Sequence, residues 1–179
     1  MGKRYDHISD KHIDFIIRRQ LFFVATASAE GRINVSPKGL DSLRIIDPNR
    51  VVWLNLTGSG NETATHLLED GRMTLMFCAF EGEPKVLRLY GKAAAHREGS
   101  ETWDAHIGRF PLLPGARQII IMDVELAASS CGFGVPLFDY VGQREALTEW
   151  AEKKGDKGVR AFCEKYNKRS VDGNPTDLA

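Results

Sequence analysis

The sequence lacks a surplus of basic residues. Its 179 residues include 24 Lys and Arg and 24 Asp and Glu, so the formal net charge at pH 7 is zero. Proteins that bind nucleic acid usually concentrate positive charge on one face or along one helix. The composition therefore argues against a nucleic-acid partner.

Cysteine is scarce, and the three residues, Cys78, Cys131 and Cys163, are far apart and form no CxxC pair. An odd, dispersed set argues against a disulfide framework and against a structural zinc site. The five histidines form no HExxH motif, so the sequence predicts no metal centre. This use of cysteine is typical of a reducing compartment, and we expect a cytoplasmic protein.

Long apolar runs are missing as well. No run reaches the length of a membrane span, and residues 1–7 lack the apolar core of a signal peptide. We find no repeat, low-complexity tract or linker either. The length is that of one domain, so we expect residues 1–179 to form a single domain that does not enter a membrane.

What the chain does contain is a succession of short strand-like runs. They are rich in β-branched and aromatic residues and are separated mostly by turn residues. The six predicted strands cover residues 22–27, 33–36, 51–56, 73–78, 85–95 and 118–126. Helices are expected at 10–19, 62–69 and 100–107, and a C-terminal helical extension at about 141–168, with a break at Gly155. This pattern predicts a mainly β protein whose antiparallel strands close into a barrel.

The most informative segment follows the third predicted strand. Thr57-Gly58-Ser59-Gly60-Asn61 forms a glycine-rich turn, and a short helix begins close behind it. Glycines allow a ligand to approach the backbone, and the first amides of a helix favour an anion. The hydroxyl groups of Thr57, Ser59 and Thr63 add hydrogen-bonding capacity, so the turn is a candidate phosphate site.

Two established phosphate motifs do not match this turn. The Lys-Ser/Thr pair of a P-loop is absent, and so is the third glycine of the dinucleotide-binding fingerprint. From the residues alone, an ordinary turn with Ser59 or Asn61 as the helix cap remains open.

The order of motifs along the chain resembles a known family. The motifs are Phe22-Phe23-Val24-Ala25-Thr26, Asn34-Val35-Ser36-Pro37-Lys38-Gly39, Trp53-Leu54-Asn55-Leu56-Thr57-Gly58, Ser59-Gly60-Asn61-Glu62-Thr63 and Leu87-Arg88-Leu89-Tyr90-Gly91-Lys92-Ala93. Over about residues 10–128 the chain resembles the pyridoxamine 5'-phosphate oxidase-like family of FMN-binding split barrels. This resemblance implies a six-stranded antiparallel split β-barrel.

The resemblance also implies a homodimer with two FMN sites formed between the subunits. Ser36 and Lys38 would then face the phosphate and ribityl chain, and Thr57 would lie near the flavin ring. The phosphate would be held by the turn residues Gly58, Ser59, Gly60, Asn61 and Thr63, and Arg88 would reach the site from a neighbouring strand. A phosphate dianion needs amides, hydroxyl groups and cations of this kind.

Some features depart from the family pattern or have a simpler explanation. Family members often carry an Arg-Lys pair where this chain has Asn61-Glu62, so Lys38, Arg88 or another basic residue must meet the phosphate charge. If Lys38 does not bind the phosphate, we expect it to be a solvated turn lysine. If Arg88 does not reach the site, we expect it to form a structural ion pair. For His66 and Cys131, the sequence assigns no chemical role.

Several functions are compatible with these residues. The first is an FMN-dependent oxidoreductase acting on a small organic substrate, in which the cofactor performs the redox chemistry. The alternatives are a non-catalytic flavin carrier or sensor, a haem-binding or haem-degrading relative on the same barrel, and a protein that uses a deazaflavin. A haem protein would need an axial ligand such as histidine.

Overall fold

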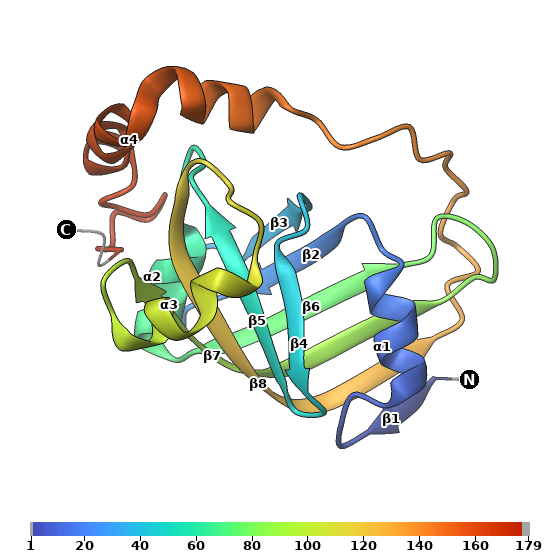
Figure 1. Ribbon diagram of the computed structural model, residues 1–179. Coiled ribbons are helices and arrows are strands. Elements are labelled where there is room, and N and C mark those ends of the chain that lie inside the picture. The colour runs from blue at the N-terminus through green and yellow to red at the C-terminus, as the bar shows by residue number, and fades with distance from the viewer. Residues whose placement is uncertain (1, 177–179) are drawn as a thin grey trace.

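The computed structural model describes residues 2–176 and contains one eight-stranded antiparallel sheet with helices around it (Figure 1). The strands are β1 (Lys3–Tyr5), β2 (Phe22–Thr26), β3 (Asn34–Lys38), β4 (Leu43–Asp47), β5 (Arg50–Leu56), β6 (Arg72–Cys78), β7 (Val86–Arg97) and β8 (Ala116–Ser130). The helices are α1 (Asp10–Ile17), α2 (Glu62–Glu69), α3 (Glu101–His106) and α4 (Ala146–Tyr166), with a short 3-10 helix at Ile107–Arg109.

The sheet runs in the order β3-β2-β6-β7-β8-β5-β4, and β1 pairs with the far end of β8. Strand β3 is therefore at one end of the sheet, and β4 with β5 is at the other end. The sheet curls until these two ends face each other without pairing (Figure 1). This is the split-barrel, mainly β architecture that the motif order predicts.

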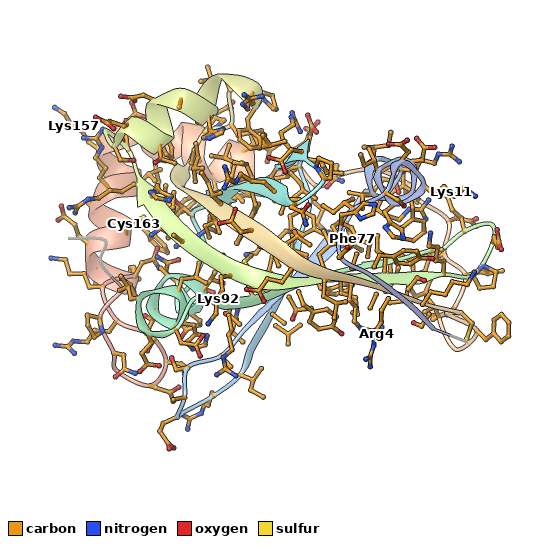
Figure 2. All side chains as sticks on the ribbon, turned by 90° about the horizontal axis from the view of Figure 1, so that it is seen from below. Arg4, Lys11, Phe77, Lys92, Lys157 and Cys163 are labelled. Carbon is orange, nitrogen blue, oxygen red and sulfur yellow. The ribbon has the colours of Figure 1, made fainter. Side chains whose placement is uncertain are left out.

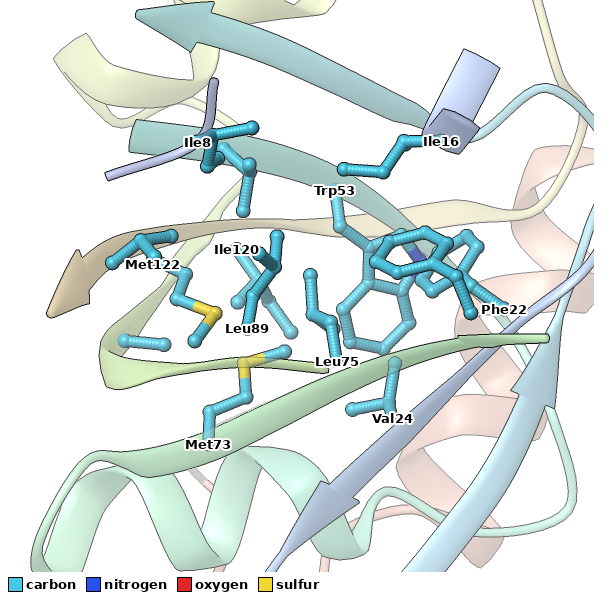
Figure 3. Packing of buried hydrophobic residues seen from close by; sticks show 14 of the residues in the cluster. Ile8, Ile16, Phe22, Val24, Trp53, Met73, Leu75, Leu89, Ile120 and Met122 are labelled. Carbon is cyan, nitrogen blue, oxygen red and sulfur yellow. The ribbon is translucent and has the colours of Figure 1, made fainter. Parts of the chain in front are cut away.

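The core fills the inside of the curled sheet. Alternate residues of β2, β6 and β7 point inward, as the two-residue period of a strand requires. Around Trp53 the core brings together Phe22, Val24, Leu75, Leu89 and Ile120, and Ile16 of α1 closes one opening (Figure 3). Burial of these apolar side chains is the main stabilising contribution to the barrel.

Strand β5 is buried on both faces. Val51 and Trp53 face the barrel core, whereas Val52 and Leu54 pack against Trp103 of α3 in a second cluster. This double burial explains why the sequence of β5 is apolar almost throughout. It also fixes the residues that follow β5, which form the candidate site.

The predicted number of strands was too small by two. Strand β4 pairs with β5 but has an irregular register between Ile45 and Asp47, so its sequence shows no clean alternation. Strand β1 has three residues and is formed only through its pairing with β8. Strand β1 depends on a partner that is distant in the sequence, and β4 pairs with an irregular register. Local sequence patterns reveal neither feature.

The chain after β8 crosses the molecule before it becomes helical again. Residues 131–145 form no helix or strand, and α4 then lies over the open end of the barrel (Figure 1). Gly155 interrupts α4 with a φ of 62°, so this segment consists of two helices with a break at the predicted glycine. None of the helices in residues 2–176 is long and apolar enough to cross a membrane.

Candidate anion and cofactor site

A cleft of about 510 Å³ lies where the two ends of the sheet face each other. Its walls come from β3, from the end of β5 with the following turn, from the start of β8 and from Leu147 of α4. Eight of the nine predicted site residues line it: Ser36, Lys38, Thr57, Gly58, Ser59, Gly60, Asn61 and Thr63. The structure therefore brings two segments of the predicted site together across the split of the barrel.

The glycine-rich turn is held from outside the cleft. Thr57 donates both its backbone N–H (2.7 Å) and its hydroxyl group (2.8 Å) to the carbonyl oxygen of Gly115. Within residues 2–176, the backbone N–H groups from Gly58 to Asn61 donate to no protein acceptor. Unpaired amides at the start of α2 fit an anion such as phosphate.

Two cations, Lys38 of β3 and Arg117 of β8, line the same cleft. Burial, with a smaller contribution from the nearby Arg117 charge, lowers the pKa of Lys38 to about 8. Burial likewise lowers the pKa of Arg117 to about 10. Neither side chain forms an ion pair with a carboxylate within the described chain. An anion bound here would stabilise both charges, and so offset their mutual repulsion and their lost hydration.

The contacts of the two cations show which donors remain for a ligand. The Lys38 Nζ lies 5.1 Å from the centre of the Trp53 ring. Arg117 donates from Nη1 to Oδ1 of Asn167 at 2.8 Å, while its buried Nε has no hydrogen-bond partner in the part of the chain described. A buried donor without a partner is costly, and a bound anion would satisfy it.

The side chain of Asn61 has a structural role that the sequence did not reveal. Asn55, Asn61 and Gln118 are buried and form a network of amides, with distances of 3.1 to 3.3 Å between their nitrogen and oxygen atoms. Gln118 lies beside Asn55 because β5 and β8 pair in that register. Asn61 thus anchors the turn through its side chain, and its backbone N–H remains available to a ligand.

Arg88 does not line the cleft of its own chain. It lies in β7 between Met76 and Ala128, and its Nη1 donates to the hydroxyl group of Ser130 at 3.3 Å. The structure therefore separates Arg88 from the other predicted site residues within one subunit. Arg117, which the sequence analysis did not single out, provides the second cation in the cleft.

Glu62 is the carboxylate among the described lining residues. It is in the first turn of α2, where the helix dipole favours an acid, and its Oε2 accepts a hydrogen bond from the Val171 N–H at 2.9 Å. The cleft residues Lys38, Arg117 and Glu62 together carry a formal charge of plus one.

The two residues without an assigned role lie outside the cleft. His66 is buried, and its Nδ1 is 3.0 Å from the hydroxyl oxygen of Thr26, as in a packed core histidine. Cys131 is exposed on the segment that follows β8. The geometry of these residues provides no chemistry for the cleft.

A second cavity of about 530 Å³ adjoins the cleft and shares Gly39, Leu40 and Leu147 with it. Phe80 and Phe138 stack in its wall with ring centres 5.4 Å apart. Both Leu40 and the following residue have left-handed backbone conformations, which are uncommon outside glycine and often mark functional sites. A strained turn therefore separates the polar cleft from an aromatic cavity.

Comparison with known proteins agrees with this architecture. The pyridoxamine 5'-phosphate oxidase family profile matches residues 8–131, about two thirds of the chain. The chain belongs to the pyridoxamine 5'-phosphate oxidase family. It is 37% identical to the pyridoxamine 5'-phosphate oxidase family protein ustO of Aspergillus flavus, over 96% of this chain and 76% of that protein.

Solved structures share the fold at lower identity. HupZ of Group A Streptococcus is 25% identical, with a TM-score of 0.53 over 66% of this chain and 91% of that one. The FAD binding protein from Mycobacterium smegmatis is 14% identical, with a TM-score of 0.51 over 70% and 97% of the two chains. The pyridoxamine 5'-phosphate oxidase family match contains Lys38, the turn and Arg117, but α4 and Asn167 lie beyond it.

Proposed function

We propose that the protein binds FMN in the cleft and acts as an FMN-dependent oxidoreductase on a small organic substrate. The observation that carries this proposal is the pair of desolvated cations, Lys38 and Arg117, beside a turn with unpaired amides. A phosphate monoester matches all of these groups at once, through charge-assisted hydrogen bonds and the backbone N–H groups.

The remainder of the cleft suits the rest of the cofactor. Trp53, Leu54, Leu56 and Leu147 provide apolar surface for a flavin ring, and Ser36 with Thr57 provides hydroxyl groups close to it. When bound, FMN supplies hydride or electron transfer, so the protein itself needs no catalytic triad. Its residues would bind the phosphate, orient the ring and exclude water from it.

The adjoining cavity is the natural place for the substrate. It opens beside Leu40 and Leu147, which also line the cofactor cleft, and its aromatic wall suits a planar or apolar molecule. Phe138 and Tyr140 line this second cavity. We therefore assign them to the substrate side of the cofactor.

We further propose a homodimer in which two subunits complete each site. Arg88 lies on the outer face of the sheet, in one row with Met76, Ala128 and Arg4. Figure 2 shows Phe77 on the side of the sheet where α1 lies and Arg4 on the opposite side. A second copy packed on this outer face would bring its own Arg88 towards a neighbouring cleft, as the family resemblance implies.

A haem-binding function has less support in this cleft. Its described lining contains no histidine, cysteine, methionine or tyrosine that could be an axial ligand. The flavin proposal needs no such residue.

The first experiment is the visible spectrum of freshly purified protein, followed by heat release and chromatography of the chromophore. Released FMN supports the proposal, whereas a haem spectrum contradicts it. If the protein is colourless, titration with FMN, haem and a deazaflavin decides among the cofactors. Failure to bind FMN at micromolar concentration would refute the assignment.

Turnover with NAD(P)H or oxygen then distinguishes an enzyme from a non-catalytic flavin carrier.

Substitution of the buried cation tests the phosphate assignment. Arg117→Met should weaken FMN binding at least about tenfold, because a hydrogen bond to a charged group contributes about 1.5–3 kcal/mol. Arg160→Met is the matched control, since Arg160 is on α4 and forms an exposed ion pair with Glu98, which follows β7. Unchanged affinity for Arg117→Met would contradict the assignment of the phosphate to this end of the cleft.

A further inference from the structure

We propose that Asn167 is a positioning residue of the cofactor site, which holds both Arg117 and the glycine-rich turn in the arrangement that binds phosphate. This inference rests on the proposed FMN function and goes beyond it. It assigns to the tail after α4, residues 167–176, a role in positioning the phosphate-binding groups.

The contacts of Asn167 connect two walls of the cleft. Its side chain is buried, with 0% of the residue exposed. The Oδ1 atom accepts a hydrogen bond from Arg117 Nη1 at 2.8 Å, and the Nδ2 atom donates to the carbonyl oxygen of Gly58 at 3.1 Å. One amide therefore fixes the start of β8 relative to the turn after β5.

The neutral amide suits this position for an electrostatic reason. Asn167 orients the guanidinium of Arg117 through Nη1 without neutralising its charge, and the Nε of Arg117 has no hydrogen-bond partner within residues 2–176. An aspartate at this position would also accept the hydrogen bond, but its charge would compete with the phosphate for Arg117. The choice of amide over carboxylate therefore keeps the cation available to a ligand.

The hydrogen bond to Gly58 orients the turn. In a trans peptide, the C=O group and the next N–H group point in opposite directions. Because Asn167 holds the Gly58 carbonyl oxygen, the Ser59 N–H points away from Asn167. Gly58 and Ser59 both line the cleft, so this peptide orientation makes an amide available for the phosphate.

Two hydrogen bonds join the tail to α2, and a third lies within the tail. The hydroxyl group of Thr65 donates to the carbonyl oxygen of Pro175 at 2.9 Å, and the Val171 N–H donates to Glu62. The hydroxyl group of Thr176 donates to the backbone oxygen of Asn167. These bonds hold Asn167 against the turn from a segment that lies beyond the family match at residue 131.

The test compares FMN with riboflavin, which has the same ring but no phosphate. Dissociation constants for both ligands are measured by flavin fluorescence with the full-length apoprotein of the wild type, Asn167→Ala and Asn167→Asp. Asn174→Ala is the matched control, because Asn174 is an exposed asparagine in the same tail whose side chain forms no hydrogen bond in the described structure. Thermal melting of each apoprotein monitors folding.

We expect Asn167→Ala to weaken FMN binding about tenfold, the value of one hydrogen bond to a charged group, and to leave riboflavin binding within about twofold. Asn167→Asp keeps the shape of the side chain and should weaken FMN binding further. Asn174→Ala should bind both ligands as the wild type does.

An unchanged ratio of FMN to riboflavin affinity in both Asn167 variants would overturn the proposal. An equal loss of both ligands would also overturn it, since it would show a purely structural role. If the wild type itself shows no preference for FMN over riboflavin, the proposed function fails first and this inference fails with it. A failure of the variants alone leaves the proposed function standing.

Discussion

Lys38 is the residue at which stability and ligand binding are most clearly opposed. Its ammonium group loses hydration in the cleft and lies beside the Arg117 charge, so the pKa falls from 10.5 to about 8. The folded apoprotein is destabilised by keeping this charge, and a bound phosphate would reverse that effect. A cation placed at such a cost is typical of a functional site.

Lys38→Met should therefore have two opposite effects. The apoprotein should melt at a higher temperature at pH 7, because an apolar side chain replaces a desolvated charge. FMN binding should weaken at least about tenfold, because a charge-assisted hydrogen bond is lost. Calorimetry and a fluorescence titration measure the two effects. Lys157→Met, on the exposed face of α4, is the control and should change neither. A less stable apoprotein with normal FMN affinity would contradict this view of Lys38.

The pH dependence follows from the same shift. Between pH 8 and 10.5 the unfolded chain keeps the Lys38 proton and the folded apoprotein has lost it. The unfolded state then binds more protons, so the Lys38 contribution makes the apoprotein more stable as the pH rises through this window. FMN affinity should fall as the pH rises above about 8, since the charged lysine is lost. Lys38→Met should lack both effects, and an identical pH profile would refute the assignment.

The buried amides provide a prediction about stability. In Gln118→Leu, Asn55 and Asn61 each lose an acceptor inside the protein. A buried polar group without a partner costs about 1–3 kcal/mol, so chemical denaturation should show a loss of at least about 2 kcal/mol. Gln20→Leu, on the surface, is the matched control and should cost less than about 0.5 kcal/mol. Equal stability of the two variants would show that the network contributes nothing.

For single residues, the sequence predicts the site residues that are consecutive in the chain and misses those whose position depends on the pairing of strands. The turn from Thr57 to Asn61 is recognisable because its residues are consecutive. Arg117 was not predicted because its place in the cleft depends on the register of β8 against β5 and on Asn167, which is 50 residues further along the chain. Two polar residues, Arg117 and Gln118, directly before the apolar run Ile119-Ile120-Ile121-Met122 are the signal that was available.

Among the elements, β7 and β8 show how closely two backbones approach. The register of the two strands shifts between Tyr90 and Gly91, as at a β-bulge. A Cβ atom at Gly91 would lie 1.9 Å from the carbonyl oxygen of Asp123. Because that neighbour is backbone in the adjacent strand, the clash cannot be relieved by a side-chain rotation.

Gly91→Ala should accordingly destabilise the protein by more than about 3 kcal/mol, or prevent folding, because the strands must separate to accept a methyl group. Gly134→Ala is the control, since a Cβ atom there would meet nothing within 4 Å. Urea denaturation of both variants measures the difference. A Gly91 variant as stable as the Gly134 variant would contradict the close approach of β7 and β8.

The elements that were predicted share a visible pattern. Strands β2 and β6 and the middle of β8, residues 121–125, alternate buried and less buried residues, and the glycine at 155 marks the break in α4. Strand β4 was missed because none of its residues is buried and its register is irregular. Local sequence therefore identifies a strand when its burial follows a regular pattern, on one face as in β2 or on both faces as in β5, and misses it when an irregular register disturbs the pattern, as in β4.

For the whole molecule, the proposed dimer explains two observations together. The outer face of the sheet exposes Val35 and Tyr90, while the helical residues Ile16 and Leu67 pack into the core on the other side. Arg88 lies on the same outer face and is absent from the cleft of its own chain. A second subunit on this face would cover apolar surface and supply the cation that the resemblance predicts.

Tyr90→Glu tests this arrangement. A carboxylate on the outer face would be desolvated on association, so the variant should become monomeric, while the wild type should have twice the 20.0 kDa mass of one chain by light scattering. FMN affinity should fall with the loss of the dimer, and Arg88→Ala should reduce affinity in a protein that remains dimeric. Leu112→Glu is the control, because Leu112 is 99% exposed in the loop before β8. A monomeric Tyr90→Glu protein that binds FMN as tightly as the wild type would show that each cleft is complete within one chain, with Lys38 and Arg117 as its only cations in the described structure.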